Sequence, residues 1–191
     1  LATPLDAGVH VQHAAWSPDG QWVTFETLDA SRPAASVWIV GVDGLDPQEV
    51  ARCPDESCLE YAYPAWSPDG SELAMIRYGP YADGSCCTSY LVVRTMSKPD
   101  ADKWVLGEDT VIASFTEADA IDTYDNYMRP TWSPDGRRLA YMVEQYGFDD
   151  PYPLLGTRLA VVGRDGGDPA FVTPLELNAG DPDWHPCADV I

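Results

Sequence analysis

One pentapeptide, Trp-Ser-Pro-Asp-Gly, constrains the fold of this chain more than any other feature. It occurs at residues 16–20, 66–70 and 132–136, and a degraded fourth copy, Asp-Trp-His-Pro, lies at residues 183–186. Each intact copy is followed by a short segment with alternating apolar residues, at 21–25, 71–76 and 137–142. A motif repeated in this way predicts a chain built from copies of one supersecondary unit.

The pentapeptide has the composition of a tight turn. Proline presets φ, serine and aspartate suit the neighbouring positions, and glycine accepts the positive φ that closes the turn. Because strand-like segments flank each copy, we expect hairpin turns between antiparallel strands. We expect the carboxylates to shape the turns rather than bind metal, and the tryptophans to fill the space between units. The residues concerned are Trp16, Asp19, Gly20, Trp66, Asp69, Gly70, Trp132, Asp135 and Gly136.

Each repeat predicts four strands. The first precedes the turn (11–16, 63–66, 129–132) and the second follows it. The third and fourth are expected at 36–40, 89–94 and 158–162, and at 48–52, 111–115 and 170–173. The connection between the last two strands of the middle repeat, at 98–109, is longer than the others and carries Trp104.

The repeated pattern of Trp-Ser-Pro-Asp-Gly, two variable residues and an apolar strand resembles the β-propeller repeat of the TolB family. Related repeats occur in the non-catalytic propellers of tricorn-type and prolyl-oligopeptidase-type peptidases. The resemblance implies an all-β fold, a partial β-propeller with about three complete four-stranded antiparallel blades and partial blades at both ends. It implies no single activity, since propellers host many functions.

The resemblance also suggests how the chain is divided. We expect a single propeller segment over 1–191, with repeats at about 16–65, 66–131 and 132–183 and partial blades at 1–15 and 184–191. Propellers of this type usually have more blades, so we expect a part of a longer protein. The alternative is self-association, in which two copies complete the ring through open sheet edges.

The charge of the chain narrows the choice of partners. Lysine and arginine total 11 against 31 acidic residues, a net charge of −20. Such a surface repels phosphate, which argues against nucleic acid and against anionic membranes. The sequence contains no apolar stretch long enough for a transmembrane helix, so we expect no membrane insertion.

Five cysteines are many for a cytosolic scaffold. Cys53 and Cys58 enclose a short turn-like segment, and we expect them to form a disulfide in an oxidising compartment. The pairing of Cys86, Cys87 and Cys187 is left open. A zinc site is the competing interpretation. The sequence offers one spaced pair of cysteines, Cys53 and Cys58, and three histidines, without a second cysteine pair to complete a zinc site. We therefore expect an extracytoplasmic location: bacterial periplasm, cell surface or secreted.

The connections at the blade end opposite the turns are long, aromatic and acidic. They are expected at 28–35, 78–88 and 145–157, and at 53–62, 116–128 and 174–182. Long loops on a rigid scaffold often carry function, and tyrosine suits a binding surface. The candidate ligand-binding face is Tyr63, Tyr78, Tyr81, Tyr124, Tyr127, Tyr146 and Tyr152. The alternative is that these rings only pack the loops against the rim.

An acidic segment at 117–126 raises the question of calcium. Asp119, Asp122 and Asp125 provide oxygen donors of the kind that hard cations need. The segment lacks the fixed spacing of a calcium-binding loop. We therefore expect no cofactor, with a structural calcium ion as the alternative.

These features favour a binding protein. The chain has no Gly-x-Ser-x-Gly nucleophile motif, and we expect no enzymatic activity in this segment, while the parent protein stays open. The favoured function is a non-catalytic extracytoplasmic propeller that binds a protein, peptide or glycan through its Tyr-rich acidic face. The alternative is the substrate-gating propeller of a peptidase or other hydrolase whose catalytic domain lies outside this segment.

Overall fold

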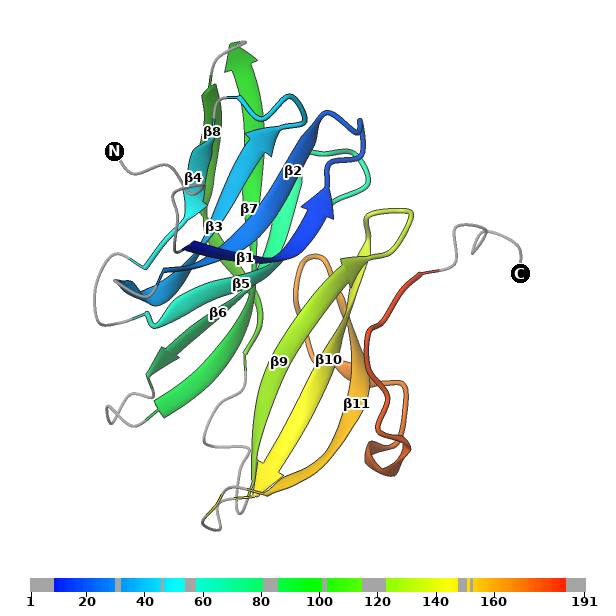
Figure 1. Cartoon of the computed structure of the whole chain (residues 1–191). Helices are drawn as coiled ribbons and strands as arrows, with labels where there is room; N and C mark the ends of the chain where they lie inside the picture. Colours follow the sequence, from blue (N-terminus) through cyan, green and yellow to red (C-terminus); the bar gives the residue numbers. More distant parts are fainter. Residues whose placement is uncertain are drawn as a thin grey trace.

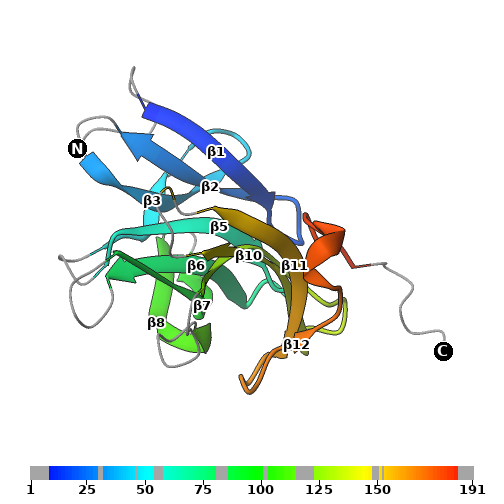
Figure 2. The same cartoon turned by 90° about the horizontal axis from the view of Figure 1, so that it is seen from below.

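Three four-stranded antiparallel sheets make up the protein (Figure 1). The computed structural model describes residues 9–29, 32–45, 47–53, 58–80, 86–100, 103–114, 123–147, 151 and 153–184. Figure 2 shows the sheets from below. The inner strands are β1, β5 and β9, the first strand of each sheet. These inner strands contact one another from sheet to sheet. The predicted all-β fold of three complete blades is confirmed.

The first sheet has its strands in chain order. They are β1 (Val9–Trp16), β2 (Trp22–Asp29), β3 (Arg32–Gly41) and β4 (Gln48–Ala51). The first strand of this repeat, predicted at 11–16, is present as part of β1, which pairs antiparallel with β2. The predicted partial-blade residues 1–8 and 185–191 lie outside the described residues.

The second sheet contains a long hairpin. Its strands are β5 (Glu60–Trp66), β6 (Glu72–Pro80), β7 (Cys86–Asp100) and β8 (Lys103–Ser114). Most of the connection predicted at 98–109 is strand, because β7 and β8 keep pairing as far as Asp100 and Lys103. The reason is alternation: Trp104 and Leu106 turn inward while Val105 stays exposed, a period-two pattern that fits a strand.

The hairpin tip is fixed to the first sheet. The Trp104 ring lies 5.6 Å from Trp22 and 5.4 Å from Trp66, measured between ring centroids. The side-chain amide of Gln48 donates to the carbonyl of Trp104 and accepts from its N–H, both at 2.9 Å. The hairpin therefore clamps the first two sheets together at their turn end.

The third sheet is covered on one side by the chain that leaves it. Its strands are β9 (Thr123–Trp132), β10 (Arg138–Gly147), β11 (Leu154–Gly163) and β12 (Ala170–Phe171), followed by the short 3₁₀ helix η2 (Leu175–Leu177). The N–H of Leu159 donates to Thr173, and the N–H of Ala179 donates to Thr157. These bonds hold the segment 173–180 against β11.

Two apolar cores lie between the sheets. Val37 and Ile39 of the first sheet pack with Leu73, Met75 and Val92 of the second. On its other face the second sheet packs Ile76 and Leu91 against a cluster from the third: Leu139, Tyr141 and Val143. Each of these side chains is fully buried, which stabilises the fold by roughly 1.5–3 kcal/mol apiece. Because both faces of β6 are covered, residues 73–76 form an unbroken apolar run.

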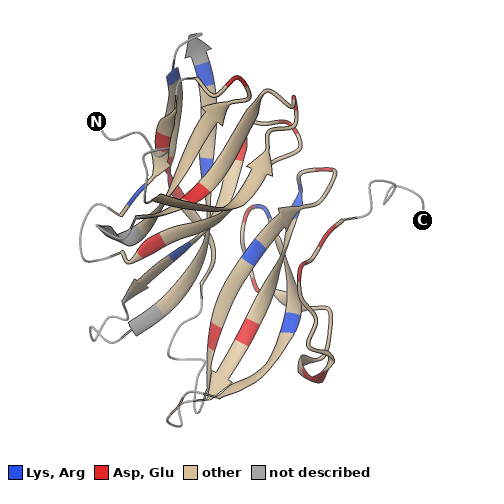
Figure 3. Ribbon diagram, in the orientation of Figure 1, with Lys and Arg blue, Asp and Glu red and all other residues tan. Residues whose placement is uncertain are grey.

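Charged side chains are spread over all three sheets, and the basic ones are few (Figure 3). Within the part of the chain that the structure describes, no helix has the length and apolar character needed to cross a bilayer.

Candidate functional site

Each of the three turns has the same pattern of hydrogen bonds. In the second turn, the Ser67 hydroxyl donates to Asp69 Oδ1 at 2.7 Å, and the N–H of Ser71 donates to the same oxygen at 3.0 Å. The N–H of Glu72 donates back to Ser67 Oγ at 2.9 Å. The first and third turns repeat these bonds within 0.1 Å through Ser17 and Asp19, and through Ser133 and Asp135.

The network explains the role of the motif aspartates. Hydrogen bonds from the motif serines, followed by those from the backbone, lower the pKa of Asp19, Asp69 and Asp135 below the ordinary value of 3.8. Each carboxylate holds its own turn closed. Among the described residues, no group of three or more His, Cys, Asp or Glu side chains is placed to hold a metal ion.

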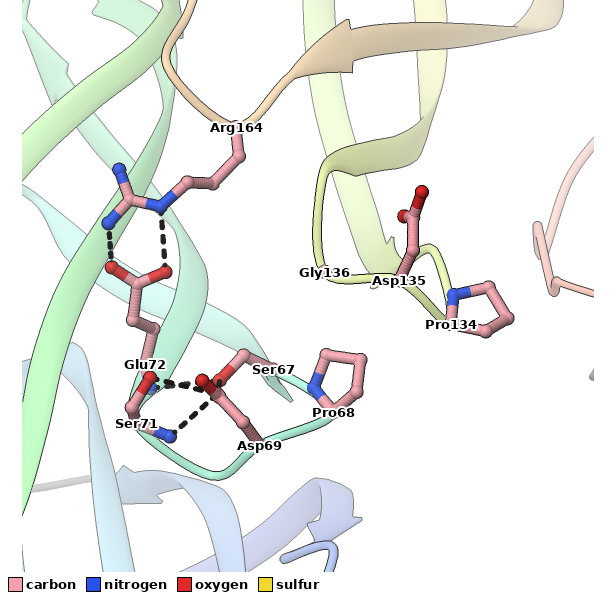
Figure 4. A pocket seen from close by; sticks show the side chains of 9 residues that line it. All are labelled: Ser67, Pro68, Asp69, Ser71, Glu72, Pro134, Asp135, Gly136 and Arg164. Carbon is pink, nitrogen blue, oxygen red and sulfur yellow. Dashed lines mark hydrogen bonds and ion pairs between the residues drawn. The ribbon is translucent and has the colours of Figure 1, made fainter.

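Adjacent turns enclose polar pockets. One of about 520 Å³ lies between the second and third turns and is lined by Asp69, Glu72, Asp135 and Arg164 (Figure 4). Arg164 spans the sheets there, because its Nε donates to Glu72 Oε2 at 3.0 Å and its Nη2 donates to Oε1. This bond is the main cause of the raised pKa of Arg164. The pocket therefore contains an inter-sheet ion pair with a carboxylate on each side.

A second pocket, of about 370 Å³, lies between the first and second turns. Trp66 and Trp104 line it together with Asp19 and Asp69. The turn end of the sheets therefore also carries a pocket with aromatic side chains, which the sequence did not predict, because the long hairpin places Trp104 beside Trp66.

The seven predicted tyrosines do not form one surface. Tyr127 is only 6% exposed and packs in the core, with its ring 4.9 Å from that of Tyr141. It was expected in a loop, but β9 begins at Thr123, and the alternation of that strand turns Tyr127 towards the second sheet. Tyr127 therefore offers no ring to a ligand. Tyr81 and Tyr152 lie outside the described residues.

Tyr124 and Tyr146 form a stacked pair at the loop end of the third sheet. They are direct partners in the pairing of β9 with β10. Their ring centroids are 5.1 Å apart and the planes differ by 10°. The Tyr146 hydroxyl donates to Glu144 Oε2 at 2.8 Å, and burial together with this bond raises its pKa to about 12. Both rings are half-buried, so they keep an accessible part.

The inner strands share a backbone feature with no obvious signal in the sequence. His13, Tyr63, Arg129 and Asp181 have φ between 49° and 54°, in the left-handed region. Each stands three residues before the tryptophan of its repeat, and the degraded fourth copy conforms as well. The first three coincide with bulges in the pairing of the inner strand.

These four residues with left-handed φ are in contact in pairs. The rings of His13 and Tyr63 lie 4.2 Å apart, and Arg129 forms an ion pair with Asp181. His13 Nδ1 also contacts the buried carboxylate of Glu26 at 2.8 Å. A non-glycine residue in this region costs roughly 1–2 kcal/mol, which the surrounding sheet must offset at each position.

Carboxylates from all three sheets act on Tyr63. Burial, with Glu26, Glu144 and Glu60 adding to it against the opposing effect of Arg129, raises the pKa of Tyr63 to about 12. The pKa of Glu60 is itself raised, by burial first and then by Glu26. Tyr78 lies nearby and donates from its hydroxyl to the Tyr127 carbonyl at 2.8 Å. We call the set formed by Glu26, Glu60, Tyr63, Tyr78, Tyr124, Glu144 and Tyr146 the central face.

Of the three calcium candidates, Asp119 and Asp122 lie outside the described residues, and Asp125 lies among them. Asp125 is nearly buried and accepts hydrogen bonds from Gln145 at 2.9 Å and Arg158 at 3.1 Å. The carboxylate oxygens of Asp125 are thus committed to other side chains of the third sheet.

The predicted disulfide between Cys53 and Cys58 is present. It closes the connection from the outer strand of the first sheet to the inner strand of the second. No pairing is described for Cys86 and Cys87, whose side chains are outside the described set, or for Cys187.

Comparison with solved structures finds the same architecture in other proteins. A TolB-type protein from Agrobacterium tumefaciens matches 96% of this chain with a TM-score of 0.58 and 18% identity. A prolyl endopeptidase matches 88% of it with a TM-score of 0.56 and 19% identity. This chain spans 57% of the first protein and 22% of the second. No protein-family model and no curated protein matches the sequence. At these identities the likeness concerns the fold alone, and that fold is part of a β-propeller.

Proposed function

We propose that this chain is a non-catalytic β-propeller segment that binds a protein, peptide or glycan through its central face. The observation that carries the proposal is the stacked pair Tyr124 and Tyr146 beside Glu144. The two stacked rings are already ordered before a ligand arrives, and their accessible parts offer aromatic surface. Tyrosine loses little conformational entropy on binding, and its hydroxyl adds a polar contact.

The charges of the central face indicate the kind of group it favours. Glu26, Glu60 and Glu144 come from three different sheets and act together on Tyr63. A ligand that brings hydrogen-bond donors or a positive charge to the half-buried Glu60 and Glu144 would offset their negative charge. Basic peptide side chains and sugar hydroxyl groups both meet this requirement, and aromatic rings favour the former through cation–π attraction.

We also propose an extracytoplasmic location. The Cys53–Cys58 disulfide supports it, because such bonds persist mainly in oxidising compartments. The strongly acidic charge is compatible with this location.

The alternative is a propeller that selects substrates for a hydrolase domain elsewhere in the parent protein. The central face would then contact substrates on their way to a distant active site. The sequence of the complete parent gene separates the two: a hydrolase domain supports the alternative, and an anchoring or signalling domain supports the first proposal.

Binding by the central face can be tested with arrays of basic peptides, acidic peptides and neutral glycans. The tightest ligand found would be titrated by calorimetry against the wild type and the double variant Tyr124→Ala/Tyr146→Ala. We expect affinity to fall at least about tenfold, since two stacking partners are lost. Trp16→Ala is the matched control, because Trp16 is 65% exposed and lies at the opposite, turn end. Equal affinity of the double variant, with its thermal unfolding cooperative, would refute the proposal.

A further inference from the structure

A pocket with several arginines lies at the seam between the first two sheets, away from the central face. It has a volume of about 320 Å³, within the usual size of small-ligand sites. We call it the arginine pocket; its polar lining is Arg52, Tyr61, Arg77, Arg94, Glu108 and Asp109. These residues come from β5, β6, β7 and β8 and from the end of β4. Three of the chain's 11 basic side chains therefore meet in one place.

Asp109 is already neutralised within the pocket. Arg94 donates to Asp109 Oδ1 from Nε at 2.9 Å and from Nη2 at 2.7 Å. The Tyr61 hydroxyl donates to the other carboxylate oxygen at 2.5 Å. The remaining Arg94 group, Nη1, donates to the carbonyl of Val50 in the first sheet. Arg94 and Asp109 thus form a closed pair that links the sheets.

Arg77 and Arg52 keep open donors. Among the described residues, Arg77 lies 3.7 Å from a carboxylate oxygen of Asp109, and Arg52 lies 3.8 Å from one of Glu49. Both separations exceed a hydrogen bond. The Arg77 guanidinium lies over the Tyr90 ring, 4.7 Å from its centroid, which fixes its plane. Counting partners among the described residues, two guanidinium groups therefore border the pocket with N–H groups that make no hydrogen bond, and that of Arg77 is oriented by Tyr90.

Basic side chains are concentrated at the pocket, although the chain as a whole has a net charge of −20. Among the described lining residues, three arginines face Glu108 and Asp109, and Glu49 lies near Arg52. The wall of the pocket is also rigid. Tyr61 is 4% exposed, and the Cys53–Cys58 disulfide holds the neighbouring connection, with Cys58 lining the pocket. Such preorganisation lowers the entropy lost when a ligand binds.

We propose that the arginine pocket binds a carboxylate between Arg52 and Arg77. The two oxygens of a carboxylate match the planar donor geometry of the guanidinium group. Asp109, saturated by Arg94 and Tyr61, leaves Arg77 available. The pocket would recognise either the carboxyl terminus of a peptide or an acidic side chain, and both share this chemistry.

Three tripeptides test the proposal. Acetyl-Ala-Ala-Ala with a free terminal carboxylate, acetyl-Ala-Glu-Ala-amide and acetyl-Ala-Ala-Ala-amide would each be titrated into the ¹⁵N-labelled chain. Shifts of the arginine Nε–Hε signals report binding. We expect one or both carboxylate peptides to shift Arg52 and Arg77, and the peptide that binds identifies the source of the carboxylate. The neutral amide should shift neither signal.

Variants complete the test. Arg77→Gln is expected to weaken binding about tenfold or more, as for a lost hydrogen bond to a charged group. Arg137→Gln, on an exposed turn residue, is the control and should bind as the wild type does. Arg52 is exposed, so Arg52→Gln provides a second variant if Arg77→Gln unfolds. Equal binding of the neutral peptide, or unchanged binding by Arg52→Gln and Arg77→Gln, would overturn the proposal.

Discussion

The indole nitrogen of Trp132 donates a hydrogen bond to the carbonyl oxygen of Ala65 at 3.1 Å. Ala65 directly precedes Trp66, the tryptophan of the previous repeat. Trp184 makes the same bond to Thr131 at 3.3 Å. Trp66 reaches back through the Thr24 hydroxyl, which in turn donates to the Ala15 carbonyl. Trp66 and Trp132 therefore each align their sheet with the one before it, and Trp184 attaches the last described residues to the third sheet.

The loss of stability on replacing a motif tryptophan should depend on which repeat carries it. Trp132 is 6% exposed, whereas Trp16 is 65% exposed in an identical pentapeptide. We expect Trp132→Ala to lower the free energy of unfolding by about 3–5 kcal/mol, through the lost packing and the cavity left behind. Trp16→Ala should change it by less than about 0.5 kcal/mol. Urea denaturation measures both, and similar losses would contradict this account.

The turn aspartates should make stability depend on acid pH. The folded-state pKa of Asp69 lies below its ordinary value of 3.8, so its contribution is complete above that pH and is lost as the pH falls. Asp69→Asn should lower the free energy of unfolding by about 1 kcal/mol at pH 7, since the carboxylate accepts several hydrogen bonds in its turn. The difference from wild type should shrink at pH 3. Asp168→Asn, on an exposed side chain, should show no such trend.

The long hairpin of the second sheet should loosen when its anchor is removed. Gln48→Ala deletes both hydrogen bonds to the Trp104 backbone. We expect amide hydrogen exchange over residues 103–107 to accelerate about tenfold, while residues 73–76 in the core keep their protection. Gln21→Ala, at an exposed turn position, is the control. Unchanged exchange at the hairpin would show that the Trp104 ring alone holds it.

Glycine should be tolerated at one bulge position although it weakens ordinary strands. Arg129 has φ of 51°, and its ion pair with Asp181 is largely exposed and therefore worth little. Arg129→Gly should leave the free energy of unfolding unchanged or raise it by up to about 1 kcal/mol. Thr110→Gly, in the regular exposed part of β8, should lower it by about 1 kcal/mol. Thermal or urea unfolding checks both, and a clear loss for Arg129→Gly would mean that its side chain matters more than its backbone.

The turn motif made the sheets predictable from the sequence. Its proline and glycine fix the turn locally, and the alternating residues that follow report strand and face. The ends of strands were harder to place. Tyr124, Tyr127 and Tyr146 were assigned to loops because acidic and polar residues surround them, yet β9 and β10 extend that far. Once they are strands, alternation sends Tyr127 into the core while Tyr124 and Tyr146 meet.

The two candidate sites depend on pairing across long stretches of sequence. Arg52, Arg77 and Arg94 are far apart in the sequence. They line one pocket only because the fold brings β6, β7 and the residue after β4 together. The left-handed bulge residues lack a local signal for a different reason. Their identities have nothing in common, and only their fixed distance from the tryptophan marks them.

That indifference to side-chain identity has a consequence for how such a protein diversifies. The same backbone conformation holds an imidazole, a phenol, a guanidinium and a carboxylate, at His13, Tyr63, Arg129 and Asp181. The scaffold sets the geometry, and the residue sets only the chemistry displayed. A single substitution at any of these four positions therefore changes the side chain on the inner side of the sheets and keeps the backbone conformation. The binding specificity of this side can change in this way, one substitution at a time.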